Sequence, residues 1–223
     1  MRWNIKIAID GPAGSGKSTV AKILASKLNL VYIDTGAMYR ACAYLSIIYD
    51  VKDSELIEIV KNTDFVFKVH EGGQRVILKV KGSVMDVTDA IRTVGVSDKV
   101  AYISKIKEIR DILTKKQKEI ARDADVVMDG RDIGTVVLPD ANYKFFLTAT
   151  PEIRAKRRYD EMRQKNIDVD YEDILKNIKM RDFEDTNRDV APLKQADDAI
   201  LIDTSNMSIN DVVKKIVGII KQR

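Results

Sequence analysis

The sequence predicts a three-layer α/β fold, in which a parallel core sheet is flanked by helices. Short apolar runs that suit buried strands alternate with longer segments whose apolar residues recur at helical spacing. A glycine-rich loop joins the first predicted strand to the first predicted helix, as in phosphate-binding α/β proteins. The alternation breaks once, where two strand-like runs flank a turn, so we expect an antiparallel β insertion in an otherwise parallel fold.

The glycine-rich loop has the pattern G-x-x-x-x-G-K-S, between a strand at residues 5–10 and a helix at residues 19–28. In such a P-loop the backbone N–H groups point inward, and the positive end of the helix dipole adds to the attraction for anions. We expect Lys17 to reach the β- and γ-phosphates of ATP as a point charge, and the Ser18 hydroxyl to hold Mg²⁺. The predicted ATP-binding residues of this segment are Gly11, Pro12, Ala13, Gly14, Ser15, Gly16, Lys17, Ser18 and Thr19.

The next elements follow from apolar periodicity. A second strand at residues 31–33 ends at Asp34, and a helix then runs through Tyr49, with a shorter helix after it that Asp53 or Ser54 caps. The antiparallel insertion comes next, with strands at 65–69 and 76–80, a turn at 71–73 and a second turn at Gly82. A long but broken helical region covers about residues 96–122.

The second half of the chain returns to the parallel sheet. Strands are predicted at residues 126–129, 143–147 and 199–202. Thr150 and Pro151 form a cap and a first turn for a helix that carries several arginines. Ser208 and Asp211 form a capping box at the start of the final amphipathic helix.

Length and composition limit the classes of protein to which this chain can belong. A chain of 223 residues can bury one full core with small insertions, but two full domains are not expected. Cys42 is the only cysteine, in a predicted buried helix, so no intramolecular disulfide is possible and a reducing cytoplasm is expected. His70 is the only histidine, which almost excludes catalytic triads and metal sites that need histidine. The chain has no bilayer-length apolar stretch and no signal-peptide pattern, so we expect no membrane partner.

The net charge of +4 admits nucleic-acid binding as a possibility, but the positions of the charges argue against it. Aromatic residues make up only 6% of the chain, which leaves a base-stacking surface poorly supported. Arginines interleaved with acidic residues in the C-terminal third instead indicate a segment that faces phosphates on a catalytic domain. These arginines are Arg154, Arg157, Arg158, Arg163, Arg181 and Arg188.

Polar side chains follow each core strand at the edge of the sheet where α/β proteins bind ligands. Asp129 ends the strand at 126–129 and is predicted to contact Mg²⁺ directly or through water, with a purely structural role as the alternative. Phosphoryl transfer between two anions requires charge neutralisation, which the planar fork of arginine supplies. We expect Arg40 and Arg131 to grip an acceptor phosphate and the C-terminal arginines to close over the donor, although an ordinary surface role suits Arg154 equally well.

Several motifs together resemble the bacterial cytidylate kinases over nearly the whole chain. After the P-loop they are Asp34-Thr35-Gly36-Ala37-Met38-Tyr39-Arg40, Asp129-Gly130-Arg131-Asp132-Ile133-Gly134-Thr135-Val136-Val137, Arg181-Asp182, Asn187-Arg188-Asp189-Val190-Ala191-Pro192-Leu193 and Ala196-Asp197-Asp198-Ala199. The P-loop alone indicates only a phosphotransferase, whereas the second and third motifs are highly specific. The resemblance implies a monomeric enzyme of pyrimidine nucleotide metabolism that phosphorylates CMP and dCMP with MgATP. It also implies a single domain at 1–223, in which 63–90 enlarges the monophosphate-binding region and 154–192 forms a helical, arginine-rich lid.

The resemblance also implies a role for each matching residue. Lys17, Arg131, Arg181 and Arg188 would be catalytic, and Arg157 and Arg158 would close on the ATP phosphates. The CMP phosphate would be surrounded by Thr35, Tyr39, Arg40, Arg131 and Arg188. Arg110 and Asp132 would read cytosine, while Arg181 and Asp185 would hold the pentose.

One departure from the family concerns base recognition, because a serine that is common in the family as a base contact aligns with Ala101. Ser104 lies one helical turn further and can replace it in part. The alternatives are another small-molecule or nucleoside monophosphate kinase on the same fold, or a P-loop switch or nucleic-acid-associated NTPase. A GTPase switch needs a base-reading motif such as N-K-x-D, which the fragments at 177–179 and 186–188 do not match.

Overall fold

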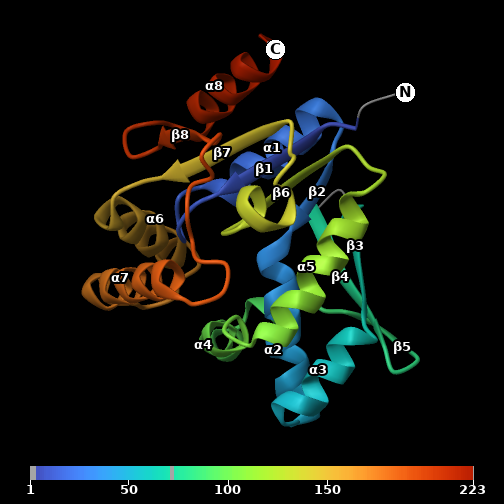
Figure 1. Cartoon of the computed structure of the whole chain (residues 1–223). Helices are drawn as coiled ribbons and strands as arrows, with labels where there is room; N and C mark the ends of the chain where they lie inside the picture. The colour runs from blue at the N-terminus through green and yellow to red at the C-terminus, as the bar shows by residue number, and fades with distance from the viewer. Residues whose placement is uncertain (1–3, 71–72, 223) are drawn as a thin grey trace. The chain divides into compact units, whose positions relative to one another are not determined.

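The computed structural model describes residues 4–70 and 73–222. The chain divides into two compact units, and the elements of each are labelled in Figure 1. The first unit combines Met1–Ile33 with Ile120–Arg223, and the second unit is Asp34–Glu119. The expected organisation as one domain, with an insertion at 63–90 and a lid at 154–192, stays a prediction.

A five-stranded sheet forms the centre of the first unit and confirms the predicted fold class. Its strands are β1 (Lys6–Asp10), β2 (Val31–Asp34), β6 (Val126–Gly130), β7 (Tyr143–Thr148) and β8 (Ile200–Asp203), in the order β2-β6-β1-β7-β8. Strand β1 lies parallel to both β6 and β7, and β8 lies parallel to β7. The register places Asp10 beside Gly130 of β6 and Phe146 of β7. The last residues of β1, β6 and β7 therefore share one edge of the sheet.

Helices α1 (Lys17–Leu28) and α8 (Ile209–Lys221) supply the apolar side chains that pack on one face of this sheet. Leu24 of α1 and Ile216 of α8 share a buried core with Ile9 and Phe145. On the other face lies a π-helical turn, η2 (Ile133–Val137), which sequence patterns did not predict. This turn approaches the sheet so closely that a Cβ atom at residue 134 would lie 3.3 Å from the Lys144 side chain.

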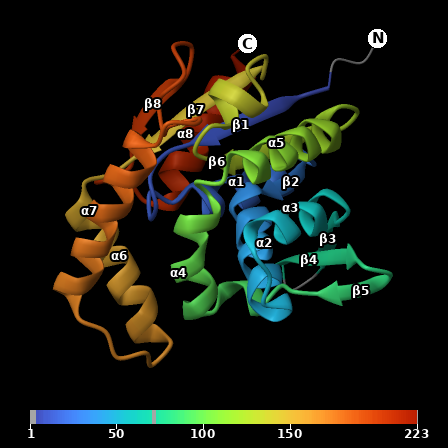
Figure 2. The same ribbon diagram turned by 60° about the horizontal axis from the view of Figure 1, so that its bottom comes forward.

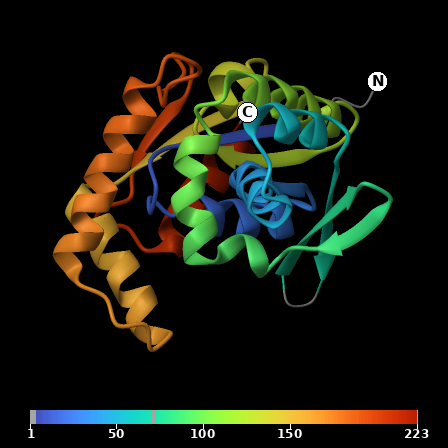
Figure 3. The ribbon, with the colours of Figure 1, turned by 90° about the horizontal axis from the view of Figure 1, so that it is seen from below.

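Two helices with their own small core follow the sheet strand β7. Helices α6 (Pro151–Gln164) and α7 (Tyr171–Asn187) lie side by side in Figures 2 and 3. Ala155, Ile174 and Ile178 are buried between them. The Thr150 hydroxyl accepts a hydrogen bond from the Ile153 N–H at 3.3 Å, which confirms the predicted cap of α6.

The second unit contains the predicted antiparallel insertion. Its three-stranded sheet is visible in Figure 2 and consists of β3 (Asp64–His70), β4 (Gly73–Val80) and β5 (Ser83–Asp86). The pairing is antiparallel throughout, as predicted. The turn that the sequence predicts at 71–73 includes residues 71 and 72, which lie outside the described residues.

Helices pack around the antiparallel sheet through a core that includes Met38, Leu45, Leu78 and Ile109. They are α2 (Thr35–Tyr49), α3 (Asp53–Lys61), the short η1 (Ala90–Arg92), α4 (Val94–Ile103) and α5 (Lys107–Ala121). Helix α4 ends at Ile103 and α5 begins at Lys107, which confirms the predicted break in the helical region. The cap of α3 differs from expectation, because Lys52 occupies the capping position and its N–H donates to the Glu55 carboxylate at 3.3 Å.

Cys42 lies fully buried in α2, and this burial raises the pKa of its thiol far above the ordinary value. Such a thiol stays protonated and unreactive, so the predicted role as a core residue is confirmed. In the part of the chain that the structure describes, none of the helices combines the length and apolar character that crossing a bilayer would take.

The burial pattern of β7 and β8 predicts which truncation will destabilise the first unit. Phe145 is 1% exposed in the central core, whereas Leu201 on the neighbouring strand is 52% exposed. Phe145→Ala should lower the free energy of unfolding by about 3–5 kcal/mol, because it leaves a cavity in the sheet core. Leu201→Ala should change it by less than about 1 kcal/mol. Urea denaturation of both variants checks this, and equal losses would contradict the assigned core.

Candidate active site

The P-loop follows β1 and needs glycine at its first position. Gly11 has a φ of 145°, and a Cβ atom at this position would lie 1.9 Å from the Leu147 carbonyl oxygen. No side chain fits between the loop and β7. This close approach fixes the start of the loop against the edge of the sheet where β1 and β7 end.

Lys17 is buried at the first position of α1. Its ammonium donates a hydrogen bond to the Pro12 carbonyl at 2.7 Å and lies 3.4 Å from the Ser15 hydroxyl. Burial, followed by the nearby positive charge of Arg131, lowers the pKa of Lys17 to about 7. A phosphate group here would supply the negative charge that a buried ammonium requires.

Ser18 and Asp129 form the predicted pair of metal-binding side chains. The Ser18 hydroxyl donates to one Asp129 oxygen at 2.7 Å, and the Tyr32 hydroxyl donates to the other at 2.8 Å. These hard oxygen donors suit Mg²⁺, which keeps water and substrate phosphates among its ligands. Residues 4–70 and 73–222 contain no cluster of three or more His, Cys, Asp or Glu side chains suited to a metal, so an all-protein cage is not found there.

Asp10 holds the segment that follows β6. One of its carboxylate oxygens accepts a hydrogen bond from the Ile133 N–H at 2.8 Å and the other accepts one from the Gly134 N–H at 2.7 Å. Burial raises the pKa of Asp10 to about 6, and the charge of Asp132 adds to the rise, although both backbone hydrogen bonds and Lys17 oppose it. Asp10 therefore fixes η2 and the preceding Asp132 to the strand that carries the P-loop.

Four predicted substrate-binding residues meet in one charge network of the first unit. Arg131 donates to Asp185 at 2.7 Å, and Arg188 lies 3.5 Å from Asp185 and 3.9 Å from Asp132. Burial by itself would raise the pKa of Asp185, but the charges of Arg131 and Arg188 hold it below its ordinary value. Carboxylates thus orient both arginines, whose guanidinium groups also bind phosphate.

The predicted lid arginines differ in their surroundings. Arg157 donates to the Thr204 carbonyl at 2.6 Å and to its hydroxyl at 3.1 Å, and this hydroxyl lies 3.2 Å from the Ser15 carbonyl of the P-loop. Arg158 is exposed and pairs with Glu161, while Arg181 is exposed on α7. Through Thr204, Arg157 is linked to the P-loop.

The remaining predicted substrate contacts lie in the second unit. Arg40 donates to Asp34 at 2.8 Å, and the Arg110 guanidinium lies 5.3 Å from the centre of the Tyr39 ring. Thr35 is buried at the start of the same helix as Tyr39. The Ser104 hydroxyl donates to the Ala101 carbonyl at 2.9 Å within its own segment. Because each unit is described by itself, the joint reading of a base by Arg110 and Asp132 stays a prediction.

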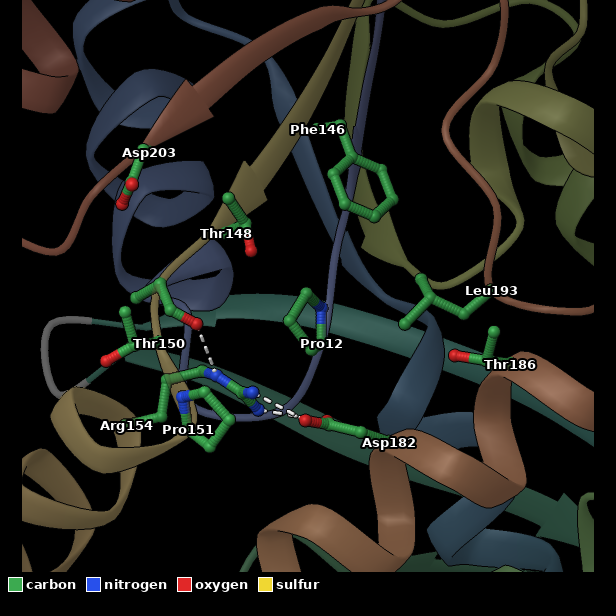
Figure 4. A pocket seen from close by; sticks show the side chains of 11 residues that line it. Pro12, Phe146, Thr148, Thr150, Pro151, Arg154, Asp182, Thr186, Leu193 and Asp203 are labelled. Atoms are coloured by element: carbon green, nitrogen blue, oxygen red, sulfur yellow. Dashed lines mark hydrogen bonds and ion pairs between the residues drawn. The ribbon is translucent and has the colours of Figure 1, made fainter.

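Sequence patterns missed two residues that organise the site, Asp10 and Tyr32. They placed Arg154 either among the arginines that close over the donor or on the ordinary surface, and so missed its buried role. Asp10 had a detectable signal, because it is a carboxylate at the end of an apolar strand immediately before the P-loop. Arg154 lines a cavity of about 430 Å³ beside Pro12 of the P-loop, together with Asp182 of α7 (Figure 4). Its buried contacts reach residues far away along the chain, so no local pattern could distinguish it from a surface arginine.

Charges gathered at a P-loop, where two anionic substrates must be held together, are what phosphoryl transfer requires. The fold and the site thus define a kinase of the P-loop class.

Comparison with known proteins narrows this class. The family model described as cytidylate kinase matches residues 7–222. The chain is 49% identical over 219 residues to the cytidylate kinase of Clostridium botulinum (strain Loch Maree / Type A3), covering 98% of this chain and 99% of the relative. It is 51% identical over 214 residues to the cytidylate kinase of Desulforamulus reducens, covering 95% and 94%. The chain belongs to the cytidylate kinase family.

A solved structure supports the fold independently. The crystal structure of an uncharacterized protein from Eubacterium ventriosum superposes with a TM-score of 0.54 at 17% sequence identity, covering 99% of this chain and all of the other. At this low sequence identity, the structural similarity shows that the two proteins share a fold.

The raised pKa of Asp10 predicts how pH changes stability. Because the folded protein binds this proton more tightly than the unfolded chain, the contribution of Asp10 is fully present below about pH 4 and is lost as pH rises through about 6. The unfolding free energy of the native protein, minus that of Asp10→Asn, should fall by about 2 kcal/mol between pH 4 and pH 7. Urea denaturation of both proteins across this range measures it, and a constant difference would contradict the assignment.

Proposed function

We propose that this protein is an ATP-dependent kinase of CMP and dCMP, which transfers the γ-phosphoryl group of ATP to the nucleoside monophosphate and releases ADP and CDP or dCDP. The observation that carries the proposal is the match to cytidylate kinases over nearly the whole chain. The buried Lys17 in a P-loop, beside paired arginines, supports the same chemistry.

The P-loop is the proposed donor site. Its backbone N–H groups and Lys17 would bind the β- and γ-phosphates of ATP. Ser18 and Asp129 would hold Mg²⁺, which neutralises phosphate charge when it is bound. Arg157 already lies close to this site, since it contacts Thr204, whose hydroxyl donates to the Ser15 carbonyl of the P-loop.

The acceptor phosphate would be held by Arg131 and Arg188, with Thr35, Tyr39 and Arg40 contributed by the second unit. Binding it requires the arginines to exchange carboxylate partners for phosphate oxygens, which arginine binds bidentately. The acceptor is already ionised, so no general base is required. The protein acts by positioning the two nucleotides, neutralising their repulsion and excluding water.

Base selection is assigned to Asp132 and Arg110. A carboxylate at Asp132 accepts a hydrogen bond from the exocyclic amine of cytosine, whereas the carbonyl of uracil would face it as a second acceptor. Arg110 would donate to the ring nitrogen and carbonyl of cytosine. Arg181 and Asp185 would hold the pentose, and Asp185 is already oriented by Arg131.

Several further features belong to the proposal. Helices α6 and α7 would act as a lid that brings Arg158 and Arg181 to the phosphates and suppresses hydrolysis of ATP. We also propose that the enzyme acts as a cytoplasmic monomer without a nucleic-acid partner.

A screen of acceptors tests the proposed reaction. With MgATP, the purified protein should phosphorylate CMP and dCMP in preference to UMP, AMP and shikimate, measured as ADP release and nucleoside diphosphate formation. Lys17→Ala should reduce turnover roughly 100-fold or more, because it removes the charge at the transferring phosphoryl group. Preference for another acceptor would assign the chain to a different P-loop kinase activity, and hydrolysis of ATP with no acceptor used would remove the kinase assignment.

Base selection by Asp132 has its own test. Asn at this position can rotate its amide to donate, so Asp132→Asn should lower kcat/KM for CMP roughly 100-fold and for UMP much less. The CMP-to-UMP ratio is the decisive quantity, since a general folding defect would lower both values alike. An unchanged ratio would move base selection to the segment that bears Ala101 and Ser104.

A further inference from the structure

Arg154 is almost entirely buried, with 3% of its side chain exposed, although it lies on the helix that was expected to present arginines to the ATP phosphates. Its Nε donates to the Ala149 carbonyl at 2.8 Å, just after β7. Its Nη1 donates to the Ala13 carbonyl of the P-loop at 3.0 Å. Both terminal nitrogens also bind Asp182 of α7, so every nitrogen of this guanidinium contacts a protein oxygen (Figure 4).

The contact with Ala13 acts on one peptide group of the P-loop. The peptide bond is planar and trans here, so the carbonyl of Ala13 and the N–H of Gly14 point in opposite directions. A guanidinium that holds the carbonyl therefore fixes the direction of the Gly14 N–H. Close packing also restricts the movement of this peptide. A Cβ atom at Gly14 would lie only 3.1 Å from the Cβ of Arg154, so the loop and α6 are in contact here.

The contact with Asp182 connects this peptide to α7. Asp182 follows Arg181 directly and lies one helical turn before Asp185, which orients Arg131. One buried guanidinium thus joins the end of β7, the P-loop and the helix that carries the proposed acceptor-site residues. The proposed function gave Asp182 no role, although it stands within one of the motifs that the sequence shares with cytidylate kinases.

We propose that Arg154 is a positioning residue for the donor phosphates: it sets the Ala13–Gly14 peptide so that the Gly14 N–H can donate to ATP, and Asp182 holds Arg154 in that orientation. The inference rests on the proposed function only in taking ATP as the phosphate donor. Arg154 itself does not contact the nucleotide in this role. The proposed role of Arg154 thus differs from that of Arg157 and Arg158, which would contact the ATP phosphates directly.

Calorimetric binding of MgADP to the full chain, with no acceptor present, tests the proposal. Arg154→Met removes the guanidinium but keeps an unbranched side chain, and it should weaken binding roughly tenfold or more, because a buried charge-assisted hydrogen bond is lost. Asp182→Asn preserves the shape of its side chain and should weaken binding about threefold. The double variant should bind no more weakly than Arg154→Met, since both changes act through one contact. In turnover assays KM for ATP should rise while KM for CMP stays unchanged.

The matched control is Lys179→Gln. It breaks the exposed Lys179–Glu152 ion pair, which joins the same two helices without touching the P-loop, and it should leave MgADP affinity unchanged. Native affinity in Arg154→Met, equal weakening in Lys179→Gln, or additive effects in the double variant would overturn the proposal. If Arg154→Met does not fold, the comparison of Asp182→Asn with Lys179→Gln decides. A native protein that binds MgADP but does not phosphorylate CMP would refute the proposed function and leave this test intact.

Discussion

A buried lysine ammonium is costly unless negative charge or hydrogen-bond acceptors surround it, and this cost governs the arrangement around Lys17. The P-loop itself supplies the Pro12 carbonyl, while Asp10, Asp129 and Asp185 supply negative charge that opposes the fall in the pKa of Lys17. These carboxylates compensate only in part for burial and for Arg131. The site is therefore built to gain favourable electrostatic energy when phosphate groups enter it, and the other contacts of the first unit keep its donors in place.

Two kinds of carboxylate surround this site. Asp10 and Asp182 each hold protein groups, the first through backbone N–H donors and the second through Arg154. Asp185 instead pairs with Arg131 and Arg188, the arginines proposed to bind the acceptor phosphate. The distinction matters for interpreting mutations. Loss of Asp10 or Asp182 should disturb geometry, whereas loss of Asp185 should disturb the balance of charge that the substrate meets.

Much of the fold could be predicted from sequence because its signals are local. The P-loop, the caps at Thr150 and Ser208, and the antiparallel strands each depend on residues close together along the chain. The roles of Asp10 and Arg154 were missed for the opposite reason, since Asp10 binds the Gly134 N–H and Arg154 binds the Ala13 carbonyl, far away in sequence. The π-helical turn at 133–137 likewise depends on Asp10 and on close packing against Lys144. No periodic pattern of apolar residues in the sequence indicates these two contacts. The grouping of Arg131, Asp132, Asp185 and Arg188 was predictable only through the shared motifs, because arginine spacing alone does not separate Arg188 from the exposed Arg158.

The effect of burial on Lys17 can be measured as the pKa of its ammonium. Carbon-detected NMR of labelled lysine, with Lys17→Met to assign the resonance, measures this pKa with and without MgADP. Burial and Arg131 should hold this pKa at about 7 in the free protein, well below the ordinary 10.5, and it should rise markedly when the nucleotide phosphates bind. A Lys17 that titrates near 10.5 in the free protein, and does not respond to MgADP, would contradict the claim that its burial prepares the loop for phosphate.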